Sequence, residues 1–131
     1  MGLASEHPPE REAPWDALLR RAGCHPVDER VRAWLRRHTH EFTAGGTVRM
    51  EGEAQPDVIW VLEGWFATEK MLPDGRRQLL DIALPCDLVQ DGGGDSPSAR
   101  CGVIALTDGA AACAPARAFA DVFGRQAALR A

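Results

Sequence analysis

Cysteine and histidine are the residues of this sequence best suited to metal or redox chemistry. The four cysteines are spread along the chain: Cys24, Cys86, Cys101 and Cys113. Zinc and iron–sulfur sites usually take two ligands from one short turn, and no two of these cysteines are that close in sequence. The spacing therefore predicts no metal and no cofactor. Free, buried thiols are expected instead, because unpaired cysteine packs as a small hydrophobe.

A glycine-rich segment is the other stretch whose composition suggests chemistry. Three consecutive glycines, Gly92 to Gly94, lie between Asp91 and Asp95 and interrupt the surrounding strand pattern. Glycines in series cost backbone entropy unless their conformational freedom is used. Such a loop either connects two strands at the surface or binds a ligand, since binding residues concentrate on loops. Both interpretations stay open.

The length and composition of the chain indicate one ordinary domain. It has 131 residues, of which 45% are hydrophobic and 26% charged, as is typical of a globular protein with a real core. No apolar run reaches the ~20 residues of a membrane helix, and the N-terminus lacks the apolar core of an export signal. We therefore expect a cytoplasmic protein without membrane contact.

The charge is distributed unevenly. The net charge is −4, with thirteen acidic and eight basic side chains in residues 41–131. Duplex-binding domains normally present a basic surface, because neutralising phosphates supplies most of the non-specific affinity. The sequence thus predicts that residues 41–131 bind nucleic acid poorly by themselves.

The N-terminal third predicts helices behind a polar arm. Residues 1–13 are polar and contain paired prolines, which is typical of a disordered arm. Two helices are expected within residues 14–38. The second is the better signalled, since Pro26 can open it and an apolar stripe from Val27 to Leu35 follows the helical period.

The centre of the chain predicts β structure. Three runs, Val58–Leu62, Trp65–Leu72 and Gln78–Leu84, are separated by Glu63-Gly64 and by a Pro-Asp-Gly turn. Proline presets φ and glycine accepts a positive φ, so these residues suit tight turns. With no helical period between the runs, we expect an antiparallel meander.

The remaining β signals complete a mainly β domain. Turn residues recur every eight to twelve positions over residues 41–114, which predicts seven or eight short strands. Such spacing without alternating helices favours a jelly roll or barrel. A C-terminal helix, residues 115–130, should follow and be interrupted at Gly124. Residues 14–131 are thus expected to form one domain.

An enzyme of the metal-dependent jelly-roll class is not expected. That chemistry needs a cluster of histidine and carboxylate ligands inside the barrel. All four histidines precede Glu41 and so lie outside the β region. The sequence predicts a non-catalytic protein.

Several motifs together resemble a known family. The runs FTAGGTVRMEGE, LEGWF and KMLPDGRRQLLDIALPCDLV, followed by IALTD, are similar to the effector domain of Crp/Fnr-type transcription regulators, closest to the Fnr-like branch. The resemblance covers about Glu41 to Ala131. It implies a cyclic-nucleotide-binding-like domain, a double-stranded β-helix of the jelly-roll type with flanking helices.

The resemblance also implies where an effector would bind. Members that bind cyclic nucleotides hold the phosphate with a Gly-Glu pair and an Arg-Ser pair after a glycine-containing step. Here Cys86 stands at the step, and the two pairs correspond to Gln90-Asp91 and Arg100-Cys101, the latter one position late. The candidate effector-binding residues are therefore Gln90, Asp91, Arg100 and Cys101.

The departures from the family pattern disfavour a cyclic nucleotide. Asp91 and Asp95 place carboxylates where the anionic phosphate would lie. Like charges ~4 Å apart repel by up to ~4 kcal/mol at an effective dielectric constant of 20. We therefore interpret the phosphate-binding cassette as degenerate. The cluster cysteines of Fnr-like oxygen sensors also have no counterpart beyond Cys24.

The family pattern also includes a long dimerisation helix and a helix-turn-helix after the β domain. The sequence ends at Ala131, so we expect no direct DNA binding by this chain alone. The leading hypothesis is the sensory, effector-binding module of a Crp/Fnr-like regulator. The alternatives are a protein-interaction module that pairs with a full-length regulator, as a homodimer or heterodimer, and a functional cyclic-nucleotide binder.

Overall fold

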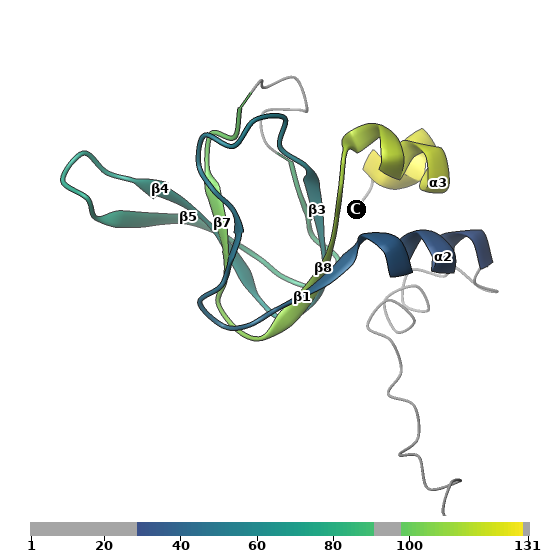
Figure 1. The fold of residues 1–131 in the computed structure, drawn as a ribbon, viewed down its shortest axis with the longest axis horizontal. Coiled ribbons are helices and arrows are strands. Elements are labelled where there is room, and N and C mark those ends of the chain that lie inside the picture. Colours follow the sequence, from purple (N-terminus) through teal and green to yellow (C-terminus); the bar gives the residue numbers. More distant parts are fainter. Residues whose placement is uncertain (1–28, 91–97, 130–131) are drawn as a thin grey trace, which may run out of the picture.

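The computed structural model describes residues 29–90 and 98–129 of the chain. In these ranges the elements, in order, are α2 (Glu29–His38), β1 (Thr39–Phe42), β2 (Thr47–Arg49), β3 (Val58–Glu63), β4 (Phe66–Met71), β5 (Arg77–Ala83), β6 (Leu88–Val89), β7 (Gly102–Ala105), β8 (Gly109–Ala114) and α3 (Ala116–Leu129). The strands face each other in two layers, and both helices lie outside one of them (Figure 1). None of the described helices is long and apolar enough to cross a bilayer.

The two layers are antiparallel four-stranded sheets. The strand orders are β1-β8-β3-β6 and β2-β7-β4-β5. Consecutive strands mostly fall in different sheets, so the chain winds back and forth between the layers. This is the jelly-roll arrangement, and it confirms the predicted fold class.

The predicted meander is wrong in one connection. β3 pairs with β6 and β8, whereas β4 pairs with β5 and β7. Only β4 and β5 form the expected hairpin. Between β3 and β4 the chain turns at Gly64, whose φ of 84° lies in the left-handed region that favours glycine. That turn carries the chain across to the opposite sheet, so Glu63-Gly64 joins layers instead of neighbouring strands.

The space between the sheets holds one apolar cluster. Its buried members come from both layers: Ile59, Val61, Phe66, Ala83, Val103, Ala105 and Ala111. Phe66 is fully buried, and its ring meets that of Phe42 edge to face, with the ring centroids 5.8 Å apart. Offset and edge-to-face pairs stabilise aromatic packing beyond simple burial. This cluster fixes the spacing of the two sheets.

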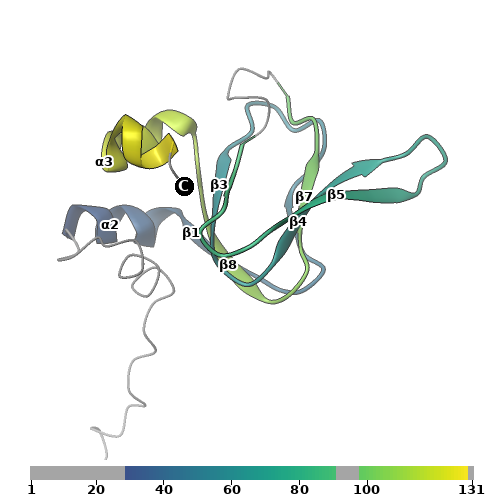
Figure 2. The ribbon, with the colours of Figure 1, turned by 180° about the vertical axis from the view of Figure 1, so that it is seen from behind.

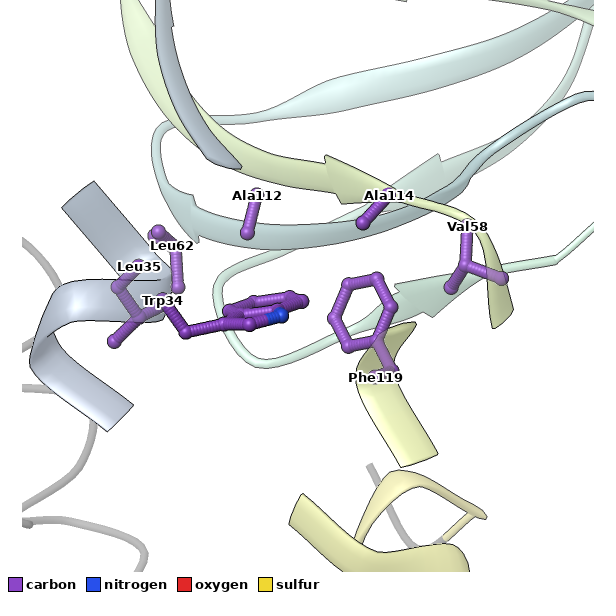
Figure 3. Packing of buried hydrophobic residues seen from close by; sticks show 7 residues of the cluster. All are labelled: Trp34, Leu35, Val58, Leu62, Ala112, Ala114 and Phe119. Atoms are coloured by element: carbon purple, nitrogen blue, oxygen red, sulfur yellow. The ribbon is translucent and has the colours of Figure 1, made fainter. Parts of the chain in front are cut away.

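A second apolar cluster lies between the outer face of the first sheet and the helices. Trp34 of α2 and Phe119 of α3 meet with ring centroids 4.8 Å apart. Figure 3 shows the two rings side by side beneath Ala112 and Ala114 of β8. Small residues on β8 leave room for the large rings. The apolar stripe predicted for the second helix thus packs against the sheet.

The β4–β5 hairpin extends beyond the body of the domain. Figure 2 shows its two strands projecting from the side opposite the helices. β7 pairs only with Phe66–Glu69 of β4, so the outer half of the hairpin is two-stranded. Several of its large apolar residues are about half exposed: Met71, Leu79, Leu80 and Ile82.

Some element boundaries differ from the sequence prediction. The first β strand begins at Thr39, two residues before the expected start of the β region. The C-terminal helix runs without a break through Gly124, because a single glycine within a helix costs only ~1 kcal/mol relative to alanine. The predicted arm at residues 1–13 and the helix expected near residues 14–22 lie outside the described residues.

Candidate functional site

An open cavity of about 480 Å³ lies between the sheets near β5 and β6. Four strands and the segment before β7 line it, through Arg49, Thr68, Asp81, Ile82, Ala83, Asp87, Leu88, Val89, Gln90 and Cys101. Ligand sites in proteins typically enclose 300–1,000 Å³ and combine an apolar wall with a few placed polar groups. The volume of the cavity lies in this range, and its lining is more polar than that of a typical ligand site.

Arg49 is the buried charge in the cavity wall. It ends β2 and is only 3% exposed. Its Nη1 donates a hydrogen bond to the backbone carbonyl oxygen of Asp57 at 3.0 Å. Burying an arginine is costly unless its donors are satisfied, so this bond both offsets part of that cost and holds the guanidinium in place.

Two carboxylates share the cavity with Arg49. Oδ1 of Asp81 accepts a hydrogen bond from the amide of Ile82 at 2.8 Å. Oδ2 of Asp87 accepts one from the amide of Leu84, also at 2.8 Å. The ion pairs among residues 29–90 and 98–129 include neither carboxylate. Among the described residues of the lining, the charged groups therefore amount to two negative charges and one positive charge.

A tight turn places Asp87 at the cavity. The amide of Asp87 donates to the carbonyl of Leu84 at 2.9 Å, closing a turn with Pro85 and Cys86 at its centre. Cys86 has a φ of 84°, a conformation that costs a residue with a side chain roughly 1–2 kcal/mol. Proline followed by a positive φ is the pattern of a type II turn, which favours glycine at the second central position.

The structure brings together two of the four predicted site residues. Gln90 and Cys101 both line the cavity. Arg100 is exposed and is not part of the lining, although its carbonyl accepts a hydrogen bond from Nζ of Lys70 at 3.2 Å. Asp91 lies outside the described residues.

The sequence analysis missed the residues that dominate the charge of the cavity. Arg49, Asp81 and Asp87 lie on or next to β2, β5 and β6, outside the cassette that the resemblance singled out. One signal was available for Arg49: in Thr47-Val48-Arg49 it occupies an alternating position of a strand. Whether such a residue faces the interior depends on register, and a pairing irregularity between Thr47 and Arg49 changes that register.

The thiols differ in environment. Cys86 is exposed, which corrects the expectation of burial for that residue, and Cys101 and Cys113 are partly buried. Burial raises the pKa of Cys113 from 9.0 to about 12, with a smaller contribution from the charge of Asp57. Cys113 is thus a neutral thiol at physiological pH. Within residues 29–90 and 98–129, no three cysteine, histidine or acidic side chains cluster as metal ligands would.

Comparison with known proteins identifies the domain. The model of the family described as "Cyclic nucleotide-binding domain" matches residues 39–126, which is most of the chain. The chain belongs to this family. The match begins at β1 and ends within α3, so it contains every strand of the cyclic nucleotide-binding domain.

One curated relative is a regulation protein. The nitrogen fixation regulation protein FixK of Bradyrhizobium diazoefficiens is 44% identical over 55 residues. That match covers 42% of this chain and 23% of FixK, so the chain spans about a quarter of this curated relative.

Solved structures share the fold. FixK2 of Bradyrhizobium japonicum is 25% identical with a TM-score of 0.57, covering 70% of this chain and 46% of that one. A transcriptional regulator of Thermotoga maritima is 23% identical with a TM-score of 0.60, covering 71% and 74%. Together with the family match, these relatives confirm the recognition of a Crp/Fnr-type N-terminal domain. The Crp/Fnr proteins are a family of transcription regulators and not of enzymes.

Proposed function

We propose that this cyclic nucleotide-binding domain is the non-catalytic, effector-binding sensor of a Crp/Fnr-like regulator. The observation that carries the proposal is the cavity between the sheets, into which Gln90 and Cys101 bring the two ends of the family's ligand-binding cassette. A ligand there would contact β2, β4, β5 and β6 at once. Binding would therefore stabilise both sheets together, which is how a sensor domain can respond as a unit.

The proposal includes a cassette that has lost its affinity for cyclic nucleotides. Gln90 replaces the first residue of the family's Gly-Glu pair, and Arg100 is outside the cavity lining. Asp81 and Asp87 add negative charge near the place of the phosphate. A cyclic-nucleotide phosphate would gain from Arg49 and lose to two carboxylates, so the balance is unfavourable.

Thermal unfolding with a panel of small metabolites tests the sensor function. A ligand at 100-fold above its Kd should stabilise the chain by ~2.7 kcal/mol. Cys101→Trp would fill the cavity and abolish the shift. Met50→Trp is the matched control, because Met50 is exposed and is not among the residues that line the cavity, and it should respond like the wild type. If no compound of the panel stabilises the wild type or either variant, the result counts against a sensor function.

The projecting hairpin supports a second candidate, a module that pairs with a related regulator chain. Ile82 lies directly opposite Ala67, Leu79 opposite Glu69, and Met71 opposite Arg77. Because opposed residues in an antiparallel pair share a face, the three apolar side chains Met71, Leu79 and Ile82 form one hairpin face. Exposed apolar patches of this kind mark interaction sites.

Charge also permits this pairing. Residues 69–81 contain three basic and three acidic side chains, so the hairpin does not add to the repulsion expected between chains of net charge −4. Size-exclusion chromatography with light scattering should show a dimer whose fraction rises with protein concentration. Leu79→Asp should weaken this dimer, and the control Met50→Asp should leave it intact. A monomer at every concentration, with no binding to a related regulator, rejects this candidate.

A further inference from the structure

We infer that the open edge of β5 pairs, strand to strand, with the same edge of a second copy of this chain. This inference rests on the second candidate function, pairing through the hairpin, and is independent of the sensor function. Among the described strands β5 is an edge of its sheet, with β4 as its one neighbour. It is seven residues long, and residues 77–82 are exposed. A long exposed edge that carries apolar side chains is a template for another strand.

The outer half of the hairpin is a two-stranded ribbon. β7 pairs only with residues 66–69 of β4, so beyond them β4 and β5 have only each other within the described part of the chain. An isolated two-stranded hairpin is marginally stable in water, and three or more strands are normally needed. Figure 2 shows the hairpin projecting away from the helices. Antiparallel pairing of two such hairpins would support both ribbons and place the two domain bodies at opposite ends.

The backbone groups of Arg77 and Leu79 point to the open side of β5. The hairpin closes where the amide of Leu72 donates to the carbonyl oxygen of Arg76 at 2.7 Å, so Arg76 faces β4. Along an antiparallel strand, successive residues direct their backbone groups alternately to the two sides. Arg77 and Leu79 therefore present their amides and carbonyls to a new strand.

The same edge is closed nearer the body of the domain. An irregularity in the pairing with β4 shifts the alternation by one residue, so Ile82 is the next residue that points outward. Its amide already donates to Oδ1 of Asp81 at 2.8 Å. The amide of Leu84 likewise donates to Oδ2 of Asp87 at 2.8 Å. Charged side chains on an edge strand oppose further pairing. A second strand can thus pair only along the outer half.

One antiparallel register uses both open residues of both copies. It sets Arg77 of one copy opposite Leu79 of the other, and Gln78 opposite Gln78. The Arg77–Leu79 pairs are then the hydrogen-bonded pairs of the new ladder. This register opposes no like charges, which would destabilise it. The two Gln78 side chains can bond amide to amide, since each has a donor and an acceptor. The edge is therefore self-complementary, as a two-fold interface requires.

A cross-link tests this register. Gln78→Cys is introduced together with Cys86→Ser, which removes the exposed natural thiol. Residues opposed in a non-hydrogen-bonded pair have Cα atoms about 4.5 Å apart, within the range that a disulfide spans. Mild oxidation should give a dimer, and peptide mapping should find the bond between the two introduced thiols. Asp74→Cys at the hairpin tip, with the same serine, is the control and should stay monomeric. Equal cross-linking of both variants, or none in either, overturns the inference.

A proline distinguishes pairing at the edge from pairing through the apolar face. Arg77→Pro removes an outward amide, which an edge strand tolerates, so the hairpin should persist. Arg77→Ala removes the same side chain but keeps the amide. Because the two-fold pair loses two hydrogen bonds at once, Arg77→Pro should raise the Kd of the dimer about tenfold. Arg77→Ala should change it little. Analytical ultracentrifugation measures both values, and equal values overturn the pairing at the edge.

The remaining outcomes separate this inference from the proposed functions. A dimer that survives Arg77→Pro but is lost in Leu79→Asp supports pairing through the apolar face and overturns pairing at the edge. A monomer at every concentration also overturns pairing at the edge. The sensor function is decided independently of both results, by the metabolite panel.

Discussion

Arg49 and Asp57 are joined by a hydrogen bond of 3.0 Å from the guanidinium Nη1 to the backbone carbonyl oxygen. The bond ties the end of β2, in one sheet, to the residue that precedes β3, in the other sheet. Arg49 is also the buried charged side chain among the described residues. Fold stability and the charge of the cavity therefore depend on the same group.

Replacing this arginine should destabilise the domain. Arg49→Ala leaves the Asp57 carbonyl without this donor and removes the packed side-chain stem, so the free energy of unfolding should fall by about 2–4 kcal/mol. Arg76→Ala is the control, because its ion pair with Asp74 is exposed and should contribute less than about 1 kcal/mol. Urea unfolding measures both, and equal losses would contradict the role of Arg49.

Gly64 should tolerate no side chain. A Cβ there would lie 2.5 Å from the carbonyl oxygen of Asp108, and φ is already 84°. Gly64→Ala should therefore cost about 2–4 kcal/mol, from backbone strain and from the clash. Gly75→Ala at the hairpin tip meets open space at a similar φ and should cost only about 1 kcal/mol. Thermal melts that show the reverse order would refute the crossing of the chain at Gly64.

Cys86 is a site where glycine should be better than the natural residue. Cys86→Gly removes the side chain from a backbone with a φ of 84° and should stabilise the domain by about 1 kcal/mol. Cys86→Ala is the matched control, since alanine keeps the strained Cβ and should give no gain. A stabilisation of equal size in both variants would mean that the thiol, and not the turn, is unfavourable.

The thiols should react at different rates. At pH 8, iodoacetamide should modify exposed Cys86 in the native protein, whereas Cys113 should react only after unfolding, because burial raises its pKa to about 12. Mass spectrometry of the labelled peptides distinguishes the two. Rapid native labelling of Cys113 would show that the β8 face is more open than the structure has it.

The raised pKa of Cys113 also predicts that the stability of the domain depends on pH. The unfolded chain loses the Cys113 proton above about pH 9.0, while the folded chain keeps it to about pH 12. Stability is thus fully present below pH 9 and falls as the pH rises through this window, because the unfolded state binds fewer protons. Cys113→Ser should flatten that fall. If the free energy of unfolding falls with pH equally steeply in the variant, groups other than Cys113 cause the loss of stability at alkaline pH.

The fold could be predicted from the sequence because the residues that favour a turn act locally. Pro73-Asp74-Gly75 predicted the β4–β5 hairpin, and the amide of Arg76 does bond to Oδ1 of Asp74. The prediction failed at Gly64, where the same kind of turn residue leads into a different sheet. Local φ preferences fix that a chain turns, whereas the choice of partner strand depends on contacts distant in sequence, such as those with Asp108.

The candidate site could be predicted from the sequence only in part, for a similar reason. Gln90 and Cys101 could be placed by resemblance to a sequential cassette. Arg49 and Asp81 could not, because they come from β2 and β5, the two edge strands of one sheet, and share a cavity only when β7 and β4 pair between them. Their shared cavity is a property of strand register, which one sequence does not reveal.

Amide chemical-shift mapping tests the central claim, that the cavity between the sheets is the effector site. The ¹⁵N-labelled chain would be titrated separately with a metabolite that stabilises it against thermal unfolding and with cyclic AMP. We predict that the stabilising metabolite shifts the amides of Thr68, Gln90 and Cys101, which line the cavity, and leaves those of helix α3 in place. If neither compound moves these three amides, or if the shifts fall only on the hairpin face, the cavity is not the effector site.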